Sequence, residues 1–490
     1  MSGRWVGSNH GRARYGARDR GGWSRPGRRI GAAVTGPLVP ELGALLATIT
    51  KSDLVDQLPT SLSKNETPNI TDCKLVGSYN WLNKKSPTIL VPGAPPQWTP
   101  ASKANKLPED SGSYFRDQNA ARYAVHVFQP TMEAILKQNP NFDLDEIDIV
   151  ACGSTLGNLR RFIAEPEKGF RFIVEAIGSA VFLVRRENSP TQTIPAVHGY
   201  GHTFPEANTT WGQDVRNSES HQRILRYQFA GLSCLVRYEG DGYLPNLHHP
   251  SVHNGEDAGD TPKDIVESLM SIIVSPAPSD GKPGLTVETG GEIVPQSAIF
   301  DLKTRTARKE YTDVLRAELP RLWLAQIPNF VVGFHNSGVF RDVRVKDVRA
   351  EVSQWEREHK GDLKKLAALL KMLVAFAHGQ PDGRFEVVSE GGEHGELELR
   401  EVSGDVNCCI SEAMRKRWID NGYDKKGAEG EKSPKRSEHV LKEAEGEKDE
   451  EYWTGQERDE DGKSGEDDSG SEEDFTACSA SCGYCGHCRY

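Results

Sequence analysis

The chain has 490 residues, of which 36% are hydrophobic and 27% are charged, a composition typical of a water-soluble folded protein with polar end segments. No uninterrupted apolar run is long enough to span a bilayer, and the first forty residues lack the apolar stretch of a secretory signal, so we expect neither a membrane protein nor a secreted one. The net charge of −11 is unevenly distributed, because residues 1–38 carry +7 and residues 441–475 carry −12.

Residues 1–40 are rich in arginine and glycine and poor in aliphatic side chains, so we expect them to be disordered. Such a segment could contact RNA, direct nuclear import, act as a mitochondrial leader or be a featureless basic tail. In the absence of a secretory signal, the scattered cysteines are expected to be reduced thiols of a protein located in the nucleus or the cytoplasm.

An α/β domain is predicted over residues 72–402. Strand-like apolar runs lie at 73–82, 86–93, 147–154, 170–187, 231–239, 297–305 and 329–335, and a closing hairpin lies at 384–402. Residues 223–230, which lead into the run at 231–239, could be a helix or a strand. Helices are predicted at 116–140, 155–166, 311–328 and 351–379, the third of them broken at Pro320. Residues 246–290 are expected to form an insertion with one helix at 264–274, and residues 403–475 a disordered acidic linker. This order of elements predicts a central mixed β-sheet flanked by helices.

One predicted strand ends in two carboxylates, in the stretch "GLSCLVRYEGDGYLP" (231–245). Glu239 and Asp241 flank Gly240, and residues two apart in a strand point to the same face, where two negative charges need water or a cation. The alternative is a solvated turn, because "EGDG" is rich in turn-forming residues.

Two further segments carry matching chemistry. Asp301 and Lys303 share one face of the strand "SAIFDLKTR", although a charged edge strand would explain them equally well. Glu206 lies in the bent segment "GYGHTFPEANTTW", which could also be a surface loop. Brought together, these carboxylates would make an oxygen-rich site for Mg²⁺ or Mn²⁺, and the lysine would help to activate water and offset charge in phosphoryl chemistry.

The order Glu206, Glu239-x-Asp241, Asp301-x-Lys303 resembles the PD-(D/E)xK nuclease pattern and, more narrowly, the DXO-like decapping exoribonucleases. "GHTFPE", "YEGD", "FDLKT", "LAQIPNFVVGFH" and "DIVACGSTLGNL" are similar to that family's motifs and occur in the same order. The resemblance implies a PD-(D/E)xK nuclease-like fold in which Glu206, Glu239, Asp241 and Asp301 bind Mg²⁺ or Mn²⁺. It also implies that Lys303, with Glu239 and Asp241, carries catalysis.

Two arginines of that family are missing, since Gly153 or Ser154 and His335 stand in their places. Arginines at these positions would bind RNA phosphates or the RNA 5′ end. The chain also resembles uncharacterised fungal proteins, some labelled geranylgeranyl pyrophosphate synthetase, but it lacks the paired DDxxD-type motifs that such an enzyme needs. We therefore expect a metal-dependent hydrolase of RNA 5′ ends. The alternative is a catalytically degenerate nuclease fold that binds RNA or protein.

Four cysteines crowd the C-terminal residues 476–490 in "CSASCGYCGHC". Cys478, Cys482, Cys485 and Cys488 have a spacing that suits Zn²⁺, while a redox-reactive flexible tail is the alternative. RNA is the expected partner, the acidic and cysteine-rich tails could bind a protein, and no membrane is involved.

Overall fold

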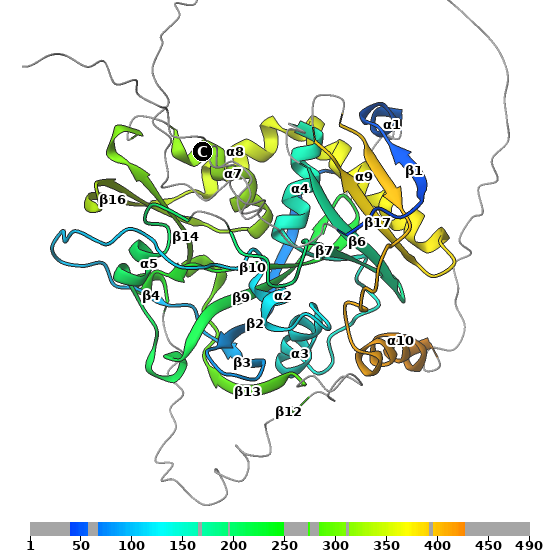
Figure 1. Ribbon diagram of the computed structural model, residues 1–490, viewed down its shortest axis with the longest axis horizontal. Helices are drawn as coiled ribbons and strands as arrows, with labels where there is room; N and C mark the ends of the chain where they lie inside the picture. The colour runs from blue at the N-terminus through cyan, green and yellow to red at the C-terminus, as the bar shows by residue number, and fades with distance from the viewer. Residues whose placement is uncertain are drawn as a thin grey trace, which may run out of the picture. The chain divides into compact units, whose positions relative to one another are not determined.

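Two mixed β-sheets organise the part of the chain that the structure describes (Figure 1). The structure is a computed structural model, and it describes residues 40–56, 67–164, 169–194, 197–248, 273–274, 284–309, 313–391 and 395–426. Helices cover the faces of the larger sheet, so the predicted architecture of a mixed sheet flanked by helices is confirmed. The sequence did not predict that the strands divide between two sheets.

The larger sheet has twelve strands in the order β1-β18-β17-β6-β7-β5-β10-β9-β2-β3-β13-β12. Strand β5 pairs in parallel with β7 and β10, and β3 pairs in parallel with β13, whereas the other pairs are antiparallel. The strands are β1 (Leu45–Ile49), β2 (Ile70–Leu82), β3 (Thr88–Gly93), β5 (Ile149–Cys152), β6 (Phe170–Ile177), β7 (Ala180–Arg185), β9 (Ser218–Phe229), β10 (Leu232–Glu239), β12 (Ile273–Val274), β13 (Thr286–Gly291), β17 (Arg384–Ser389) and β18 (Leu397–Arg400).

The smaller sheet has six strands in the order β16-β15-β14-β11-β4-β8. Strand β14 runs parallel to β15 and antiparallel to β11, so this sheet is mixed as well. The strands are β4 (Gln97–Trp98), β8 (Thr209–Thr210), β11 (Gly242–Tyr243), β14 (Ile299–Thr306), β15 (Asn329–Asn336) and β16 (Val339–Asp347).

Helices pack on both faces of the larger sheet. The helices in the described ranges are α1 (Lys51–Asp56), α2 (Gln118–Arg122), α3 (Gln129–Gln138), α4 (Gly153–Ala164), α5 (Thr203–Asn208), α7 (Val314–Ala325), α8 (Arg349–Glu358), α9 (Lys360–Gly379) and α10 (Glu412–Lys426). Figure 1 shows α4, α7 and α9 on one side of the sheet and α3 and α10 on the other. None of these helices is long and apolar enough to cross a membrane.

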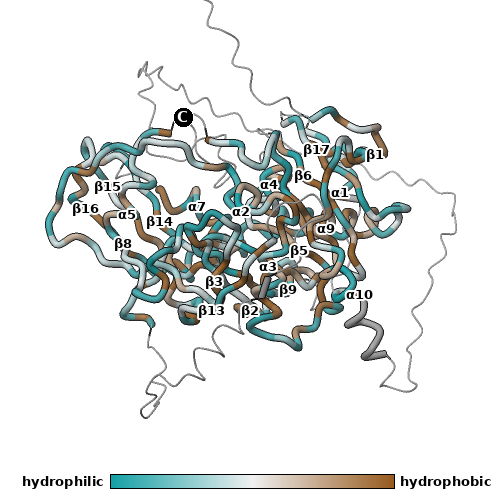
Figure 2. Tube along the Cα trace, turned by 60° about the horizontal axis from the view of Figure 1, so that its bottom comes forward, coloured by the Kyte–Doolittle hydropathy of each residue, from teal (hydrophilic) through white to brown (hydrophobic). Residues whose placement is uncertain are grey.

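The alternation of side chains along the strands divides the core into two layers. Cys234 and Val236 of β10 belong to the cluster under α4, α7 and α9, whereas Leu235 belongs to the cluster under α3 and α10, as the two-residue repeat of a strand requires. In Figure 2 the hydrophobic colouring gathers around the central strand β5 and the helix α9. A third apolar cluster lies on the smaller sheet, where Phe300 and Leu302 pack with Phe204 of α5.

Two of the predicted helices are each divided in two. The segment 116–140 contains α2 and α3, because Tyr123 leaves the helical conformation and a new helix begins at Gln129, with Pro130 in its first turn. The segment 351–379 contains α8 and α9, which meet at His359. The ring Nδ1 of His359 lies 2.8 Å from the carbonyl oxygen of Trp355, beside the backbone bond that the same residues make, and a side chain that competes for helical carbonyls weakens the helix locally.

Three other predictions were wrong. Pro320 does not break its helix, since α7 runs from Val314 to Ala325 with Pro320 buried inside it. Residues 412–426 of the predicted disordered linker form α10, whose Trp418 is buried in the core. Ile273 and Val274, at the end of the predicted helix 264–274, form strand β12, and the other residues of that helix lie outside the described ranges. Burial outweighed the helix-breaking tendency of Pro320 in α7, and burial of Trp418 anchors α10, whose polar composition had suggested disorder.

The glycine at the start of β11 allows the smaller sheet to close. A Cβ atom on Gly242 would lie 2.4 Å from Cζ of Phe300 and 2.8 Å from the carbonyl oxygen of Pro96. We therefore expect Gly242→Ala to destabilise the protein by at least about 1–3 kcal/mol, the usual cost of overpacking, measured by urea unfolding. Gly157→Ala is the control, because its Cβ would meet only Cδ1 of Leu324 at 3.9 Å. Equal stability of the two variants would contradict this packing.

Candidate functional site

The chain passes from one sheet to the other between Glu239 and Asp241. Strand β10 of the larger sheet ends at Glu239, and β11 of the smaller sheet starts at Gly242. The N–H of Gly240 still bonds to the carbonyl oxygen of His221 on β9, at 2.9 Å. The two carboxylates therefore lie neither on one continuous strand nor in a hairpin turn. They lie on either side of Gly240, where the chain passes from the larger sheet to the smaller one, a point that we call the crossover.

Asp241 connects two of the predicted motifs. Its Oδ2 accepts a 2.7 Å hydrogen bond from the backbone N–H of Leu302 on β14, because β11 pairs with β14 in the smaller sheet. Asp301 and Lys303 flank Leu302 and are buried, with 1% and 7% of their surface exposed. The structure thus brings Asp241, Asp301 and Lys303 together, although 60 residues separate Asp241 from Asp301.

Helix α7 adds two charged residues that sequence reasoning missed. Arg321 forms a two-pronged ion pair with both carboxylate oxygens of Asp301, and its Nη2 also lies 3.1 Å from Oε2 of Glu318. Arg305, two residues beyond Lys303 on β14, reaches Oε1 of Glu318 at 3.4 Å. The signal for this cluster was the charged pair Glu318 and Arg321, three residues apart in a largely apolar helix, where both fall on one face.

The proximity of these charges shifts the pKa values of the group. Burial, and then the neighbouring Asp301 carboxylate, raise the pKa of Asp241 to about 8, although Arg321, Lys303 and the Leu302 N–H act in the opposite direction. Burial raises the pKa of Glu318, but Lys303, Arg321 and Arg305 outweigh it and lower that pKa to about 2. Burial lowers the pKa of Arg321, while Asp301 and Glu318 together raise it well above its usual value.

The other predicted ligands are not gathered with this pair. Glu206 lies exposed on α5, where its charge contributes to the raised pKa of Tyr114, after burial and Asp110. Glu239 is half-buried at the end of β10. In the described ranges, no three His, Cys, Asp or Glu side chains are arranged to hold a metal ion. The cysteines Cys478, Cys482, Cys485 and Cys488 lie outside those ranges, so zinc binding stays a prediction.

The carboxylate oxygens of Asp241 and Asp301 are the type of ligand atom that Mg²⁺ and Mn²⁺ prefer. Burial, and after it the repulsion from Asp301, raises the pKa of Asp241, and a dication would relieve the repulsion. The fit carries one condition. Both oxygens of Asp301 are held by Arg321, so a metal would bind Asp301 only if that contact opened.

A buried polar network packs against the crossover. Arg223 is fully buried, and its Nε and Nη2 donate to Oε1 of Gln296 at 3.1 Å and to the carbonyl oxygen of Val294 at 2.9 Å. A Cβ on Gly240 would lie 3.3 Å from Cδ of this arginine, so the crossover packs directly on it. The hydroxyl of Tyr238 shares Gln296 with Arg223, which ties the end of β10 to the same network.

The DXO-like family that the sequence resembles carries arginines at two positions where this chain has Gly153 or Ser154 and His335, and the surroundings of these positions differ. Gly153 starts α4, and a Cβ there would meet only the Cβ of Tyr238 at 3.7 Å and the carbonyl oxygen of Arg237 at 3.9 Å. His335 is buried among aromatic rings, with ring centroids 4.5 Å from Tyr200 and 5.0 Å from Phe340. His335 thus packs against the aromatic residues of the apolar cluster on the smaller sheet.

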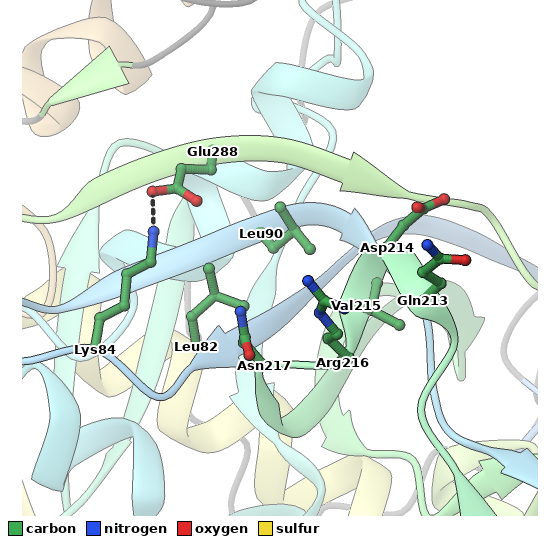
Figure 3. Close-up of a pocket in the computed structure, with 9 residues that line it drawn as sticks. All are labelled: Leu82, Lys84, Leu90, Gln213, Asp214, Val215, Arg216, Asn217 and Glu288. Carbon is green, nitrogen blue, oxygen red and sulfur yellow. Dashed lines mark hydrogen bonds and ion pairs between the residues drawn. The ribbon is translucent and has the colours of Figure 1, made fainter.

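A separate pocket lies away from these residues. Figure 3 shows it between strands β3 and β13 and the loop that precedes β9, with the ion pair of Lys84 and Glu288 at its edge. Its volume is about 230 Å³. The lining residues are Leu82, Lys84, Leu90, Gln213, Asp214, Val215, Arg216, Asn217 and Glu288. Because its charges are of both signs and it contains none of the predicted site residues, we assign it no role.

Comparison with known families places the fold and the charged cluster in one domain. The model of a family described as "Domain of unknown function (DUF8563)" matches residues 51–391, which include every residue of the cluster. The chain belongs to this family. The matched region of this DUF8563 protein also takes in α1, which precedes the predicted domain start at residue 72, and β1, just before the match, pairs with β18. No match was found among curated proteins.

Several solved structures are similar to the DUF8563 chain. Rai1 from S. pombe in complex with 3′-FADP shares 11% identity with a TM-score of 0.46, over 73% of this chain and 100% of that one. Rai1 from Scheffersomyces stipitis in complex with (3′-NADP)⁺ and calcium ion shares 13% identity with a TM-score of 0.46, over 74% and 97%. Dxo1 from K. lactis in complex with manganese shares 11% identity with a TM-score of 0.41, over 74% and 99%.

Proposed function

We propose that this DUF8563 protein is a divalent-metal-dependent hydrolase that cleaves phosphodiester or pyrophosphate bonds at RNA 5′ ends. One observation carries the proposal: the hydrogen bond from the Leu302 N–H to Asp241 joins the Glu-x-Asp motif to the Asp-x-Lys motif in one buried site. The sequence resemblance to DXO-like decapping exoribonucleases supplies the substrate class.

Each residue of the site has a chemical task in this proposal. Asp241 and Asp301 would hold Mg²⁺ or Mn²⁺, which supplies polarisation of a phosphoryl group and a more acidic water when bound. The buried ammonium of Lys303, which acts electrostatically on both Asp241 and Glu318, would donate to a phosphoryl oxygen and offset the charge that develops there. Glu318 holds the cations of the cluster in place. The water oxygen would form a new bond to phosphorus as the bond from phosphorus to the leaving oxygen breaks. The water gives up one proton to the solvent, and the leaving oxygen takes up one proton from it.

The ion pair between Arg321 and Asp301 favours a second candidate function. Asp301 and Glu318 already have Arg305 and Arg321 as partners without any metal, and a pKa of about 8 leaves Asp241 largely protonated at neutral pH. A cluster whose carboxylates are satisfied in this way could be a structural feature of a nuclease fold that binds RNA or protein and no longer cuts. Metal-dependent turnover separates the two candidates.

The first experiment measures hydrolysis of three RNA oligonucleotides, which carry a 5′-triphosphate, a 5′-monophosphate or a cap, with Mg²⁺ or Mn²⁺. We expect turnover of at least one substrate by the wild type, and a loss of about 10²–10³-fold in Lys303→Ala, because removing one group that stabilises transition-state charge has that size of effect. Lys346→Ala is the control, since Lys346 lies exposed on β16 and pairs with Glu351.

The outcomes separate the candidates. Cleavage by the wild type and by Lys346→Ala, but not by Lys303→Ala, would support the hydrolase, and the preferred 5′ end would define the substrate. If the wild type bound an oligonucleotide in a gel-shift assay and did not cleave any of the three with either metal, the binding module would replace the hydrolase.

A further inference from the structure

Arg321 stands where the positive charge of a metal ion would be needed. Its guanidinium engages both oxygens of Asp301 and also contacts Glu318, and its electrostatic effect extends to Asp241. It comes from α7, a separate element from the strands that carry the two aspartates. A planar guanidinium matches a carboxylate with two parallel hydrogen bonds, which makes such a contact specific as well as strong.

The position of Arg321 is held by packing. Only 19% of its side chain is exposed, while Asp301 and Glu318 are each 1% exposed. The helix that carries it packs into the main core through Leu322 and Trp323. Arg321 is therefore a built part of the site, and a bound cation must compete with it for Asp301.

Resting on the proposed function, we infer that Arg321 is a resident counter-ion that sets the metal affinity of the site. While it holds Asp301, the carboxylate pair binds divalent cations weakly. When it releases Asp301, the two aspartates become available to Mg²⁺ or Mn²⁺. The residue thereby determines the metal concentration at which the site is loaded, and it acts through Asp301 as a positioning residue.

The test measures Mn²⁺ binding without turnover, by isothermal titration calorimetry on the full chain. Arg321→Gln is expected to bind Mn²⁺ about tenfold or more tightly than the wild type, because the competing cation is gone. Arg321→Lys keeps a charge but cannot engage both oxygens, so its affinity is expected to fall between the two. The double variant Arg321→Gln/Asp301→Asn is expected to lose the gain.

A matched control exists in the larger sheet. Arg171 forms the same kind of bidentate ion pair with Glu386, with Nε and Nη2 at 2.7 Å and 2.9 Å from the two carboxylate oxygens. Arg171→Gln therefore removes an equivalent ion pair from another part of the protein. We expect this variant to keep the wild-type Mn²⁺ affinity. Circular dichroism and thermal unfolding, with and without Mn²⁺, verify that each variant is folded. The Mn²⁺-induced rise in melting temperature should be larger for Arg321→Gln than for Arg171→Gln.

The outcomes distinguish this inference from the proposed function. Equal Mn²⁺ affinity in the wild type, Arg321→Lys and Arg321→Gln would overturn the role of Arg321, while turnover by the wild type would still support the hydrolase. The absence of Mn²⁺ binding in every variant, together with no turnover by the wild type, would overturn both. Tighter binding by Arg321→Gln that persists after Asp301→Asn would place the metal elsewhere and would also overturn the inference.

Discussion

Replacing Asp241 by Asn is expected to abolish metal-dependent turnover while leaving the protein folded. The Asn side-chain oxygen can still accept the hydrogen bond from the Leu302 N–H, so the link between β11 and β14 survives. The charge that would hold the cation is lost. We expect activity to fall by more than the roughly 10–100-fold that changes outside the ligand shell cause, measured on the 5′ end that the wild type prefers.

In a metal-free buffer, the same substitution is expected to raise the stability of the protein at high pH. The pKa of Asp241 in the folded protein is about 8, against an ordinary value of 3.8. The folded state therefore keeps a proton that the unfolded state has released, and Asp241 lowers stability progressively as the pH rises from about 4 to about 8. Asn carries no such penalty, so the variant should match the wild type at pH 4 and exceed its melting temperature at pH 9.

Asp342→Asn is the control for both measurements, because Asp342 pairs with Arg344 at the exposed edge strand β16. It should keep full activity and show no gain at pH 9. Wild-type turnover in Asp241→Asn would remove Asp241 from the site, and a melting temperature below that of the wild type at pH 9 would contradict the electrostatic account.

Truncating Glu318 to Ala is expected to cost about 3–5 kcal/mol of unfolding free energy at pH 7, the usual result of leaving buried partner charges uncompensated. Glu318 is 1% exposed and interacts with Lys303, Arg305 and Arg321. Its loss leaves those three cations facing only the two aspartates. Urea unfolding monitored by tryptophan fluorescence measures the difference, and Trp323 on the same helix is buried.

The cost should depend on pH. The pKa of Glu318 is lowered from 4.5 to about 2 in the folded protein, so its contribution is fully present above about pH 4.5 and is lost as the pH falls toward 2. The gap between Glu318→Ala and the wild type should therefore shrink on acidification. Glu398→Ala, which breaks a half-exposed pair with Arg400, should cost at most about 1 kcal/mol. Equal costs for the two variants would contradict a buried network.

The strands that carry the site could be predicted because their side chains alternate. Asp301 and Lys303 share one face of β14 while Phe300 and Leu302 share the other, so the two-residue period was visible in the sequence. The proximity of Asp241 to this strand was implied only by the resemblance to the DXO-like exoribonucleases, whose motifs occur in the same order. The division into two sheets was not predictable in this way, because it depends on which strands pair over long sequence distances, and alternation does not encode pairing.

The charges of α7 were missed because Pro320 was expected to break the helix. A break at Pro320 would have removed Glu318 and Arg321 from a common face, since residues three apart lie together only on an intact helix. Burial of Pro320 and its neighbours in the core keeps the helix continuous. The ion pairs of the site thus depend on tertiary packing that overrides a local signal.

The crossover at Gly240 makes the geometry of the site depend on the number of residues between β10 and β11. Glu239 is fixed by the ladder of one sheet and Asp241 by the pairing of the other, with a single residue between them. An added residue would place a different side chain opposite Leu302, and a deletion would pull one strand out of its ladder. Insertions and deletions should therefore be tolerated in the surface loops of either sheet, whereas the spacing of this three-residue segment cannot vary without dismantling the carboxylate pair.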